Sequence, residues 1–182
     1  MRNQLNSNKM KKIFSISVFL TMCMFANAVT YSISNNGKEF IKSVEKCKLT
    51  AYPDANGYSI GWGHHGSDVT AGMTINQRTA DKYFNEDIKD AERMVNWLLK
   101  QLPYEYKFSQ GFIDGMVSLV YNAGAGNVQK SAFYQRLKRC RVKGGKMNES
   151  DFVYTLAAVK TSCVTCKGHK PRRVQEYNMM IN

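Results

Sequence analysis

Apolar residues recur every three or four positions over long stretches of the chain, which is typical of helices with one buried face. This spacing predicts helices over about 38–47, 75–100, 109–121, 131–141, 149–160 and 171–181. We expect Thr74 to cap the second helix, and Pro171 suits the first turn of the last one. The 109–121 stretch is apolar on most sides, so this helix is expected at the centre of the domain.

Residues 49–62 follow a different pattern. Asn56-Gly57 stands between two β-prone runs, and an Asn-Gly pair in that context is typical of a tight hairpin turn. The pattern breaks off at His64-His65. Neighbouring residues on a strand point to opposite faces, so these histidines are not expected to bind one metal ion. The sequence therefore predicts a small β-hairpin directly after the first helix.

The first 28 residues resemble an export signal rather than part of the fold. An uncharged run of 13 residues, Ile13–Phe25, precedes Ala26-Asn27-Ala28, which matches a small-x-small cleavage site. The basic residues before the run are Arg2, Lys9, Lys11 and Lys12. The run is shorter than the roughly 20 residues that span a membrane. We predict a signal peptide over 1–28 and one domain over 29–182. An uncleaved inner-membrane anchor and a buried terminal helix are the alternatives.

Composition and charge narrow the class of partner. The chain has 182 residues, of which 43% are hydrophobic and 22% charged, as in an ordinary globular protein with one core. Without residues 1–28 it has 22 basic and 14 acidic residues, a net charge of +8. A positive surface favours a polyanion, and export argues against nucleic acid. An anionic membrane, a cell-wall polymer and a merely solvated basic face remain open.

Five cysteines are present, and Cys23 belongs to the predicted signal. The other four are Cys47, Cys140, Cys163 and Cys166. An even number in an exported protein predicts disulfides, with three possible connectivities. The Cys163–Cys166 pair has the spacing of half a zinc site, but no second pair of ligands is evident in the sequence. We therefore expect disulfides and no metal site.

Two carboxylates flank the junction of the first helix and the hairpin. Glu45 falls near the predicted helix end, and Asp54 follows nine residues later. Glycoside hydrolysis uses one partly buried acid to protonate the leaving oxygen, and one wetter carboxylate that positions water or attacks the sugar. The hydroxyl of Ser59 is a candidate for holding that water. The spacing itself is common, so a capping Asp and a surface Glu explain it as well.

Three blocks of sequence carry more specific information. Glu45 is followed by eight residues, Asp54, and then Ser59-Ile-Gly-Trp-Gly-His64. Tyr121-Asn-Ala-Gly-Ala-Gly126 precedes Lys130-Ser131-Ala-Phe-Tyr-Gln-Arg-Leu137, and Gly168-His-Lys-Pro-Arg172-Arg173-Val-Gln-Glu176 lies near the C-terminus. In this order the blocks resemble the catalytic hairpin, the Phe-Asn-x-Gly-x-Gly segment with its following helix, and the C-terminal Arg-Arg-x-x-Glu segment of the phage-type lysozymes, glycoside hydrolase family 24.

The resemblance implies an α+β, mostly helical, lysozyme-like fold, with a small β-hairpin lobe and a helical lobe flanking a cleft. It implies a muramidase that cleaves the β-1,4 bond between N-acetylmuramic acid and N-acetylglucosamine without a cofactor. Glu45 carries over as the general acid, Asp54 as the carboxylate that orients water, and Ser59 at the position of the family's Thr. The positions that contact glycan are Gly63, Tyr121 and Ser131. His64 is mainly structural, and Arg172 or Arg173 pairs with Glu45.

The sequence departs from the family pattern at two places. The interval from Asp54 to Ser59 is one residue shorter, and Ser replaces Thr. Cys47 lies two residues after the acid, where the family has no fixed cysteine. Some exported members with membrane-anchor leaders use a cysteine near the catalytic Glu as a thiol–disulfide lock. The resemblance therefore raises a disulfide between Cys47 and a distant cysteine, with a small packed residue as the alternative.

These inferences together predict a monomeric protein that is secreted or periplasmic, acts on peptidoglycan glycan strands, binds no nucleic acid and meets the membrane only through its leader. Two other classes remain as rivals. One is a non-catalytic peptidoglycan-binding module with a decayed active site, and the other is a membrane-active basic lytic protein. A transglycosylase, which forms an anhydro-sugar, is a related enzymatic alternative.

Overall fold

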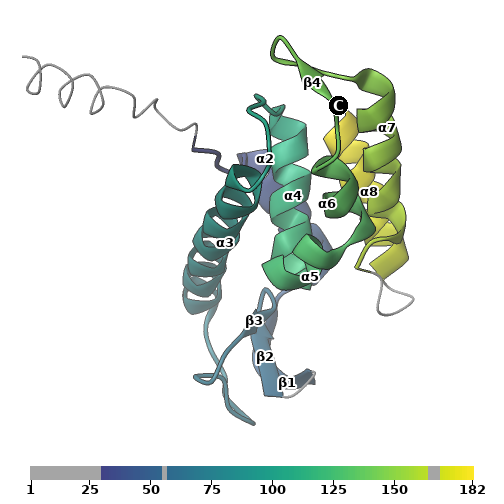
Figure 1. Ribbon diagram of the computed structural model, residues 1–182. Coiled ribbons are helices and arrows are strands. Elements are labelled where there is room, and N and C mark those ends of the chain that lie inside the picture. Colours follow the sequence, from purple (N-terminus) through teal and green to yellow (C-terminus); the bar gives the residue numbers. More distant parts are fainter. Residues whose placement is uncertain (1–29, 55–56, 164–168) are drawn as a thin grey trace, which may run out of the picture. The chain divides into compact units, whose positions relative to one another are not determined.

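The computed structural model describes residues 30–54, 57–163 and 169–182 (Figure 1). The chain divides into two units, residues 1–30 and residues 31–182. The predicted signal, residues 1–28, lies outside the described residues. In the part that the structure describes, no helix combines the length and the apolar character needed to cross a membrane.

The second unit is mostly helical. Its helices are α2 (Asn35–Glu45), α3 (Gln77–Lys100), α4 (Gln110–Ala123), α5 (Ala125–Lys130), α6 (Ala132–Leu137), α7 (Glu149–Ala157), the 3-10 helix η1 (Ala158–Thr161) and α8 (His169–Ile181). An antiparallel sheet has the order β1 (Lys48–Asp54), β2 (Gly57–Gly61), β3 (His64–His65), and β4 (Val142–Lys143) pairs with β5 (Lys146–Met147). These elements confirm the predicted mostly helical α+β class.

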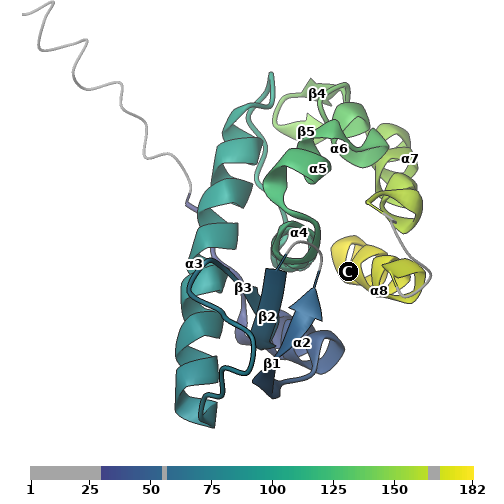
Figure 2. The same cartoon turned by 90° about the horizontal axis from the view of Figure 1, so that it is seen from below.

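Helix α4 forms the centre of the second unit, as its apolar sequence predicts. It packs against α2, α3, α5 and α8, and every residue from Phe112 to Val120 is buried. Figure 2 looks along α4, with α3 on one side and α8 on the other. A Cβ added at Gly115 would lie 2.5 Å from Cγ of Met180, so the glycine permits α8 to approach closely. This approach matters because α8 carries the arginines of the third sequence block.

Helix α2 is fixed to α4 at its start. It begins at Asn35 because Ser34 caps it, with Ser34 Oγ accepting from the N–H of Gly37 at 3.1 Å. The N–H of Ser34 in turn donates to Oδ1 of Asp114 on α4 at 2.8 Å. The helix ends at Glu45, since Lys46 adopts φ +57°, outside the helical region. Glu45 is therefore the last residue of a helix that is anchored to the core.

Helix α3 begins two residues after the predicted start. Asn76 is its N-cap, because Oδ1 of Asn76 accepts from the N–H of Thr79 at 2.9 Å. Thr74, which we expected to cap this helix, instead pairs with Thr50 in an isolated β-bridge. The prediction failed because the bridge is a tertiary contact that local sequence does not encode.

The β-hairpin forms where the Asn-Gly pair predicts it. Asp54 pairs with Gly57 across residues 55–56, which lie outside the described residues. Tyr52 pairs with Ser59, and Ser59 pairs with His65 on β3, a strand that was not predicted. Directly paired residues project to the same face of a sheet, as do residues two apart on one strand. Tyr52, Asp54, Ser59 and His65 therefore share one face.

The chain departs further from prediction after α4. Gly124 has φ +76° and ends α4, but α5 begins directly after it. The predicted 131–141 helix ends at Leu137, and β4 and β5 then form a hairpin around Gly144 and Gly145, both with positive φ. A Gly-Gly pair is a signal for a tight hairpin turn, and here it outweighs the weak apolar periodicity. Helix α7 and η1 together fill the predicted 149–160 helix.

Candidate active site

Glu45 lies at the C-terminal end of α2, next to the turn that joins β2 to β3. Its side chain is only 18% exposed. A Cβ added at Gly63, which has φ +96°, would lie 3.3 Å from Oε2 of Glu45. The bare backbone at Gly63 therefore borders one oxygen of the carboxylate. The other oxygen, Oε1, accepts a hydrogen bond from Nη1 of Arg172. The structure thus brings together two predicted site residues, Glu45 and Gly63, with an arginine.

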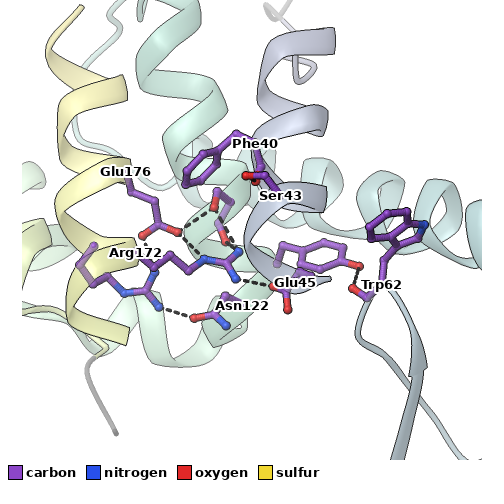
Figure 3. A network of polar contacts seen from close by, with 10 residues as sticks. Phe40, Ser43, Glu45, Trp62, Asn122, Arg172 and Glu176 are labelled. Carbon is purple, nitrogen blue, oxygen red and sulfur yellow. Dashed lines mark hydrogen bonds and ion pairs between the residues drawn. The ribbon is translucent and has the colours of Figure 1, made fainter. Parts of the chain in front are cut away.

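Arg172, rather than Arg173, is the partner of Glu45. Figure 3 shows Arg172 between Glu45 and Glu176. Its Nε donates to Oε1 of Glu176 at 3.0 Å, and its Nη2 donates to both the carbonyl and the hydroxyl oxygen of Ser118 at 3.2 Å. The side chain of Arg172 is only 7% exposed, and acceptors on three helices set the orientation of its guanidinium.

Arg173 forms a second ion pair with Glu176. It is completely buried, donates from Nη1 to Oε2 of Glu176, and donates from Nη2 to Oδ1 of Asn122. Glu176 is also completely buried and therefore bridges the two arginines. Two guanidinium groups face two carboxylates, so the cluster is balanced in charge, as buried charges must be to be tolerated. The cluster joins α2, α4 and α8 at one point.

The second acid forms a separate hydrogen-bonded group on the sheet. Asp54 is exposed at the end of β1, whereas Ser59 on the neighbouring strand is completely buried. Ser59 Oγ donates to Oδ2 of Asp54 at 2.8 Å, and it also lies 3.2 Å from Nδ1 of His65. The shortened interval therefore still brings the hydroxyl to the carboxylate. The single hydroxyl proton of Ser59 is directed at Asp54.

The phenol of Tyr52 is within electrostatic reach of both acids. Burial raises the pKa of its phenol, and the negative charges of Asp54 and Glu45 raise that pKa further. Both carboxylates therefore lie close enough to affect one side chain. The pair combines a largely buried acid with an exposed one, as the sequence predicts. Tyr52 was not identified from the sequence, because its nearness to both acids depends on the register of the hairpin.

His64 lies beside the site and holds the sheet to α3. Its Nδ1 is 2.9 Å from Oδ2 of Asp87, its Nε2 is 3.3 Å from Oδ2 of Asp68, and its ring stacks on Tyr83 at 4.3 Å between centroids. Burial lowers the pKa of His64, but the hydrogen bonds and charges of Asp87 and Asp68 outweigh it, so the pKa is raised overall. These contacts fit the structural role that the sequence suggested.

The hydroxyl of Tyr121 also makes a contact within the fold. It donates to the backbone carbonyl of Trp62 at 2.9 Å and so fixes the peptide next to Gly63. Burial raises the pKa of Tyr121, which keeps this hydroxyl a donor. The indole Nε1 of Trp62 donates to Oδ1 of Asp81 at 2.8 Å, which ties the same segment to α3. Tyr121 thus positions the wall of the site beside Glu45.

Ser131 lies on a pocket of about 290 Å³. Its hydroxyl caps α6, accepting from the N–H of Tyr134 at 3.2 Å and donating to the carbonyl of Val128 at 2.7 Å. The pocket is lined by Asn122, Ala123, Asn127, Lys130, Ser131, Cys163 and His169. Asn122 also bonds Arg173, so the pocket borders the buried charge cluster. Its volume is close to the lower end for sites that hold small molecules, about 300 Å³.

The expected disulfides are not seen among the described cysteines. Cys47, Cys140 and Cys163 are free thiols, and Cys166 lies outside the described residues. Burial raises the pKa of the Cys47 thiol, which is partly exposed. In the same described part of the chain, no group of three or more His, Cys, Asp or Glu side chains is placed to hold a metal ion.

The sequence and the fold are similar to those of known proteins. The family model described as phage lysozyme matches residues 42–176. The endolysin of Lactococcus phage c2 is 43% identical over 50% of this chain and 39% of its own length, and the SAR-endolysin of bacteriophage PS34 is 28% identical over 56% and 58%. The chain thus spans about two fifths of the length of the first of these relatives.

A solved structure extends the likeness to the fold. The endolysin from Escherichia coli O157:H7 phage FAHEc1 superposes with a TM-score of 0.66 and 26% identity, over 85% of this chain and 96% of that one. The region matched by the family model runs from α2 to Glu176 and therefore includes Glu45, the hairpin and both arginines. The chain belongs to the phage lysozyme family.

Proposed function

We propose that the protein is an exported, monomeric muramidase that hydrolyses the β-1,4 bond between N-acetylmuramic acid and N-acetylglucosamine in peptidoglycan. The observation that carries this proposal is the placement of Glu45, a largely buried acid at a helix end, between Arg172 and the bare backbone of Gly63. Asp54, exposed on the adjacent strand, supplies the second carboxylate.

In this proposal Glu45 reacts in its protonated form and gives that proton to the glycosidic oxygen as the bond from that oxygen to C1 breaks, whereas the ion pair with Arg172 belongs to the form without the proton. Asp54 accepts a proton from the water whose oxygen forms the new bond to C1. Arg172 then faces the carboxylate left on Glu45 and stabilises its charge, because the guanidinium is already oriented by Ser118 and Glu176. Ser59 holds Asp54 through its 2.8 Å hydrogen bond.

We further propose that Gly63, Tyr121 and Ser131 border the bound glycan. Gly63 supports this because no side chain separates its backbone from Glu45, and Ser131 because it lines the pocket beside the charge cluster. The ring of Tyr121 borders the glycan in this proposal, and its hydroxyl fixes the peptide of Trp62. The cleft then runs from the hairpin towards α5 and α6.

An anionic cell wall suits the charge of the protein. Between Asp114 and Glu149 the sequence contains no acidic residue. After Leu137, four exposed cations of this stretch have no acidic partner among the described residues: Lys138, Arg139, Lys143 and Lys146. They lie after α6 and on the β4–β5 hairpin. We propose that this basic end attracts the protein to the wall polymer.

Export is proposed from residues 1–28, with action in the periplasm or outside the cell. The similarity to proteins named SAR-endolysin supports an endolysin that carries its own leader. We also propose that Cys47 forms a disulfide with a distant cysteine after export, where the compartment is oxidising, since it lies two residues from Glu45 and is partly exposed. Peptide mass mapping of the exported protein under non-reducing conditions tests both the fate of residues 1–28 and the disulfide of Cys47. A free Cys47 thiol together with activity unchanged by reduction would refute the disulfide.

Clearing of a peptidoglycan suspension tests the proposed activity against its rivals. Wild type should clear the suspension, and Glu45→Gln should bind the wall without clearing it. Binding without clearing by the wild type would instead identify a non-catalytic module. Lysis of whole cells by Glu45→Gln at the wild-type rate would identify a membrane-active protein. Activity retained by Asp54→Asn would show that the second acid is assigned to the wrong residue.

A further inference from the structure

His65 makes a contact that the roles assigned so far do not use. It lies on β3 directly opposite Ser59, and its Nδ1 is 3.2 Å from Ser59 Oγ. Ser59 is completely buried, and its hydroxyl is 2.8 Å from Oδ2 of Asp54. Three side chains on three neighbouring strands therefore form one line that ends at the proposed second carboxylate.

Proton accounting fixes the direction of both bonds. A serine hydroxyl has one proton to donate, and an ionised carboxylate can only accept. The proton of Ser59 is therefore given to Asp54, and the contact with His65 requires a proton on Nδ1 of the imidazole. Both the neutral Nδ1–H tautomer and the imidazolium satisfy this requirement. His65 thus donates to a lone pair of Ser59, which in turn donates to Asp54.

The position of the His65 ring is also constrained on its far side. A Cβ added at Gly57 would lie 3.2 Å from Cε1 and 3.6 Å from Nε2 of His65. Gly57 is the residue paired with Asp54 at the start of β2. The ring therefore packs against the bare backbone at the hairpin end, and a larger residue at position 57 would displace it.

We propose that His65 is a positioning residue for the reaction. Its Nδ1–H occupies a lone pair of Ser59 and so holds the Ser59 hydroxyl on Asp54, which keeps the carboxylate oriented towards the water that it activates. In this way the third strand restrains a hairpin whose interval from Asp54 to Ser59 is one residue shorter than the family pattern. This inference rests on the proposed hydrolysis, in which Asp54 orients water.

Kinetics of five variants on soluble glycan chains test the proposal. His65→Leu should lower kcat about tenfold and change KM by less than about twofold, because the lost group orients a catalytic carboxylate rather than binding substrate. His65→Asn, which is smaller but keeps an N–H donor at about the distance of Nδ1 from the backbone, should recover kcat to within about threefold of wild type. The double variant His65→Leu/Ser59→Ala should be no slower than Ser59→Ala alone, since His65 acts through Ser59. Ser67→Leu places a leucine at another exposed position of the same lobe and should leave kcat unchanged.

Nitrogen NMR of the imidazole gives a test on the wild-type protein that does not depend on how the variants fold. The neutral ring of His65 should carry its proton on Nδ1. A neutral ring protonated on Nε2 would overturn the proposal, because Nδ1 could not then donate to Ser59. A His65→Leu variant with wild-type kcat, or a double variant slower than Ser59→Ala, would overturn it as well. Glu45→Gln separates a failure of the His65 proposal from a failure of the proposed function. Activity in that variant would contradict hydrolysis with Glu45 as the acid, whatever His65 does.

Discussion

Arg172 on α8 and Glu45 on α2, 127 positions apart in the sequence, form an ion pair at the edge of a buried charge cluster. The pair brings the last helix of the domain to the proposed acid. Because Arg172 also bonds Glu176 and Ser118, the position of Glu45 depends on the packing of α8 against α4. A change at Arg172 should therefore affect both the stability of the fold and the position of the proposed acid.

Replacing Arg172 tests that coupling. Arg172→Met should lower the free energy of unfolding by about 3–5 kcal/mol, because it leaves Glu176 with one cationic partner and Glu45 with none among the described residues, in a largely buried site. Urea denaturation measures the change. Arg78→Met, at an exposed arginine with no acidic partner among the described residues, should stay within about 0.5 kcal/mol of wild type. Similar losses in both variants would contradict the role of the cluster.

Gly63 provides a test in which backbone strain and contact with Glu45 can be separated. Gly63→Ala strains a residue at φ +96° and places Cβ 3.3 Å from Oε2 of Glu45. It should cost about 1 kcal/mol of stability and lower kcat more than about tenfold. Gly72→Ala is the matched control, since Gly72 has φ +77° but no atom within 4 Å of an added Cβ. It should lose a similar stability and keep its activity. Equal loss of activity in both would show that strain alone is responsible.

The pH dependence of stability tests the contacts of His64. The raised pKa of His64 means that its protonated form stabilises the fold. This contribution is complete below the unfolded pKa, about 6.5, and is lost as the pH rises through the folded pKa. His64→Gln should therefore cost more free energy of unfolding at about pH 5.5 than at about pH 9. A cost that does not change with pH would contradict the ion pair, and Asp87→Asn should remove most of the difference.

The two lysines of the β4–β5 hairpin, Lys143 and Lys146, should control attraction to the cell wall rather than catalysis. Lys143→Ala/Lys146→Ala should weaken sedimentation with cell walls several-fold at about 50 mM salt, and the difference should vanish near about 500 mM because exposed charges are screened. Rates on short soluble glycans should not change. Lys82→Ala/Lys89→Ala removes the same charge from exposed positions on α3 and serves as the control. Equal weakening by both pairs would mean that net charge acts, rather than the hairpin.

Much of the fold follows from local sequence. The apolar periodicity predicts helices in the right places, the continuous apolarity of residues 109–121 predicts the central helix, and Asn56-Gly57 predicts the hairpin. The predicted start of α3 was wrong, and the β4–β5 hairpin was not predicted. In the first case Thr74 is held by a distant strand, and in the second a Gly-Gly turn ends the helical pattern early. Local signals are weakest where tertiary pairing decides a boundary.

The candidate site was predictable only in part. Glu45, Asp54 and Gly63 follow from the motif, but the choice of Arg172 over Arg173 depends on the rotation of α8 against α4. Ser118 had one signal, a polar residue within an apolar helix, and it bonds Arg172. Tyr52 and His65 had none, because their places depend on strand register. Residues that support a site from neighbouring strands emerge only from the structure.

The identity of the released sugar ends tests the central claim most directly. Wild type acting on purified peptidoglycan should release muropeptides whose N-acetylmuramic acid carries a hydrated, reducing end, and Glu45→Gln should release none. Mass analysis distinguishes these ends from anhydro ends, which lack one water. Anhydro ends from the wild type, or hydrated ends from Glu45→Gln at a comparable rate, would contradict hydrolysis with Glu45 as the acid.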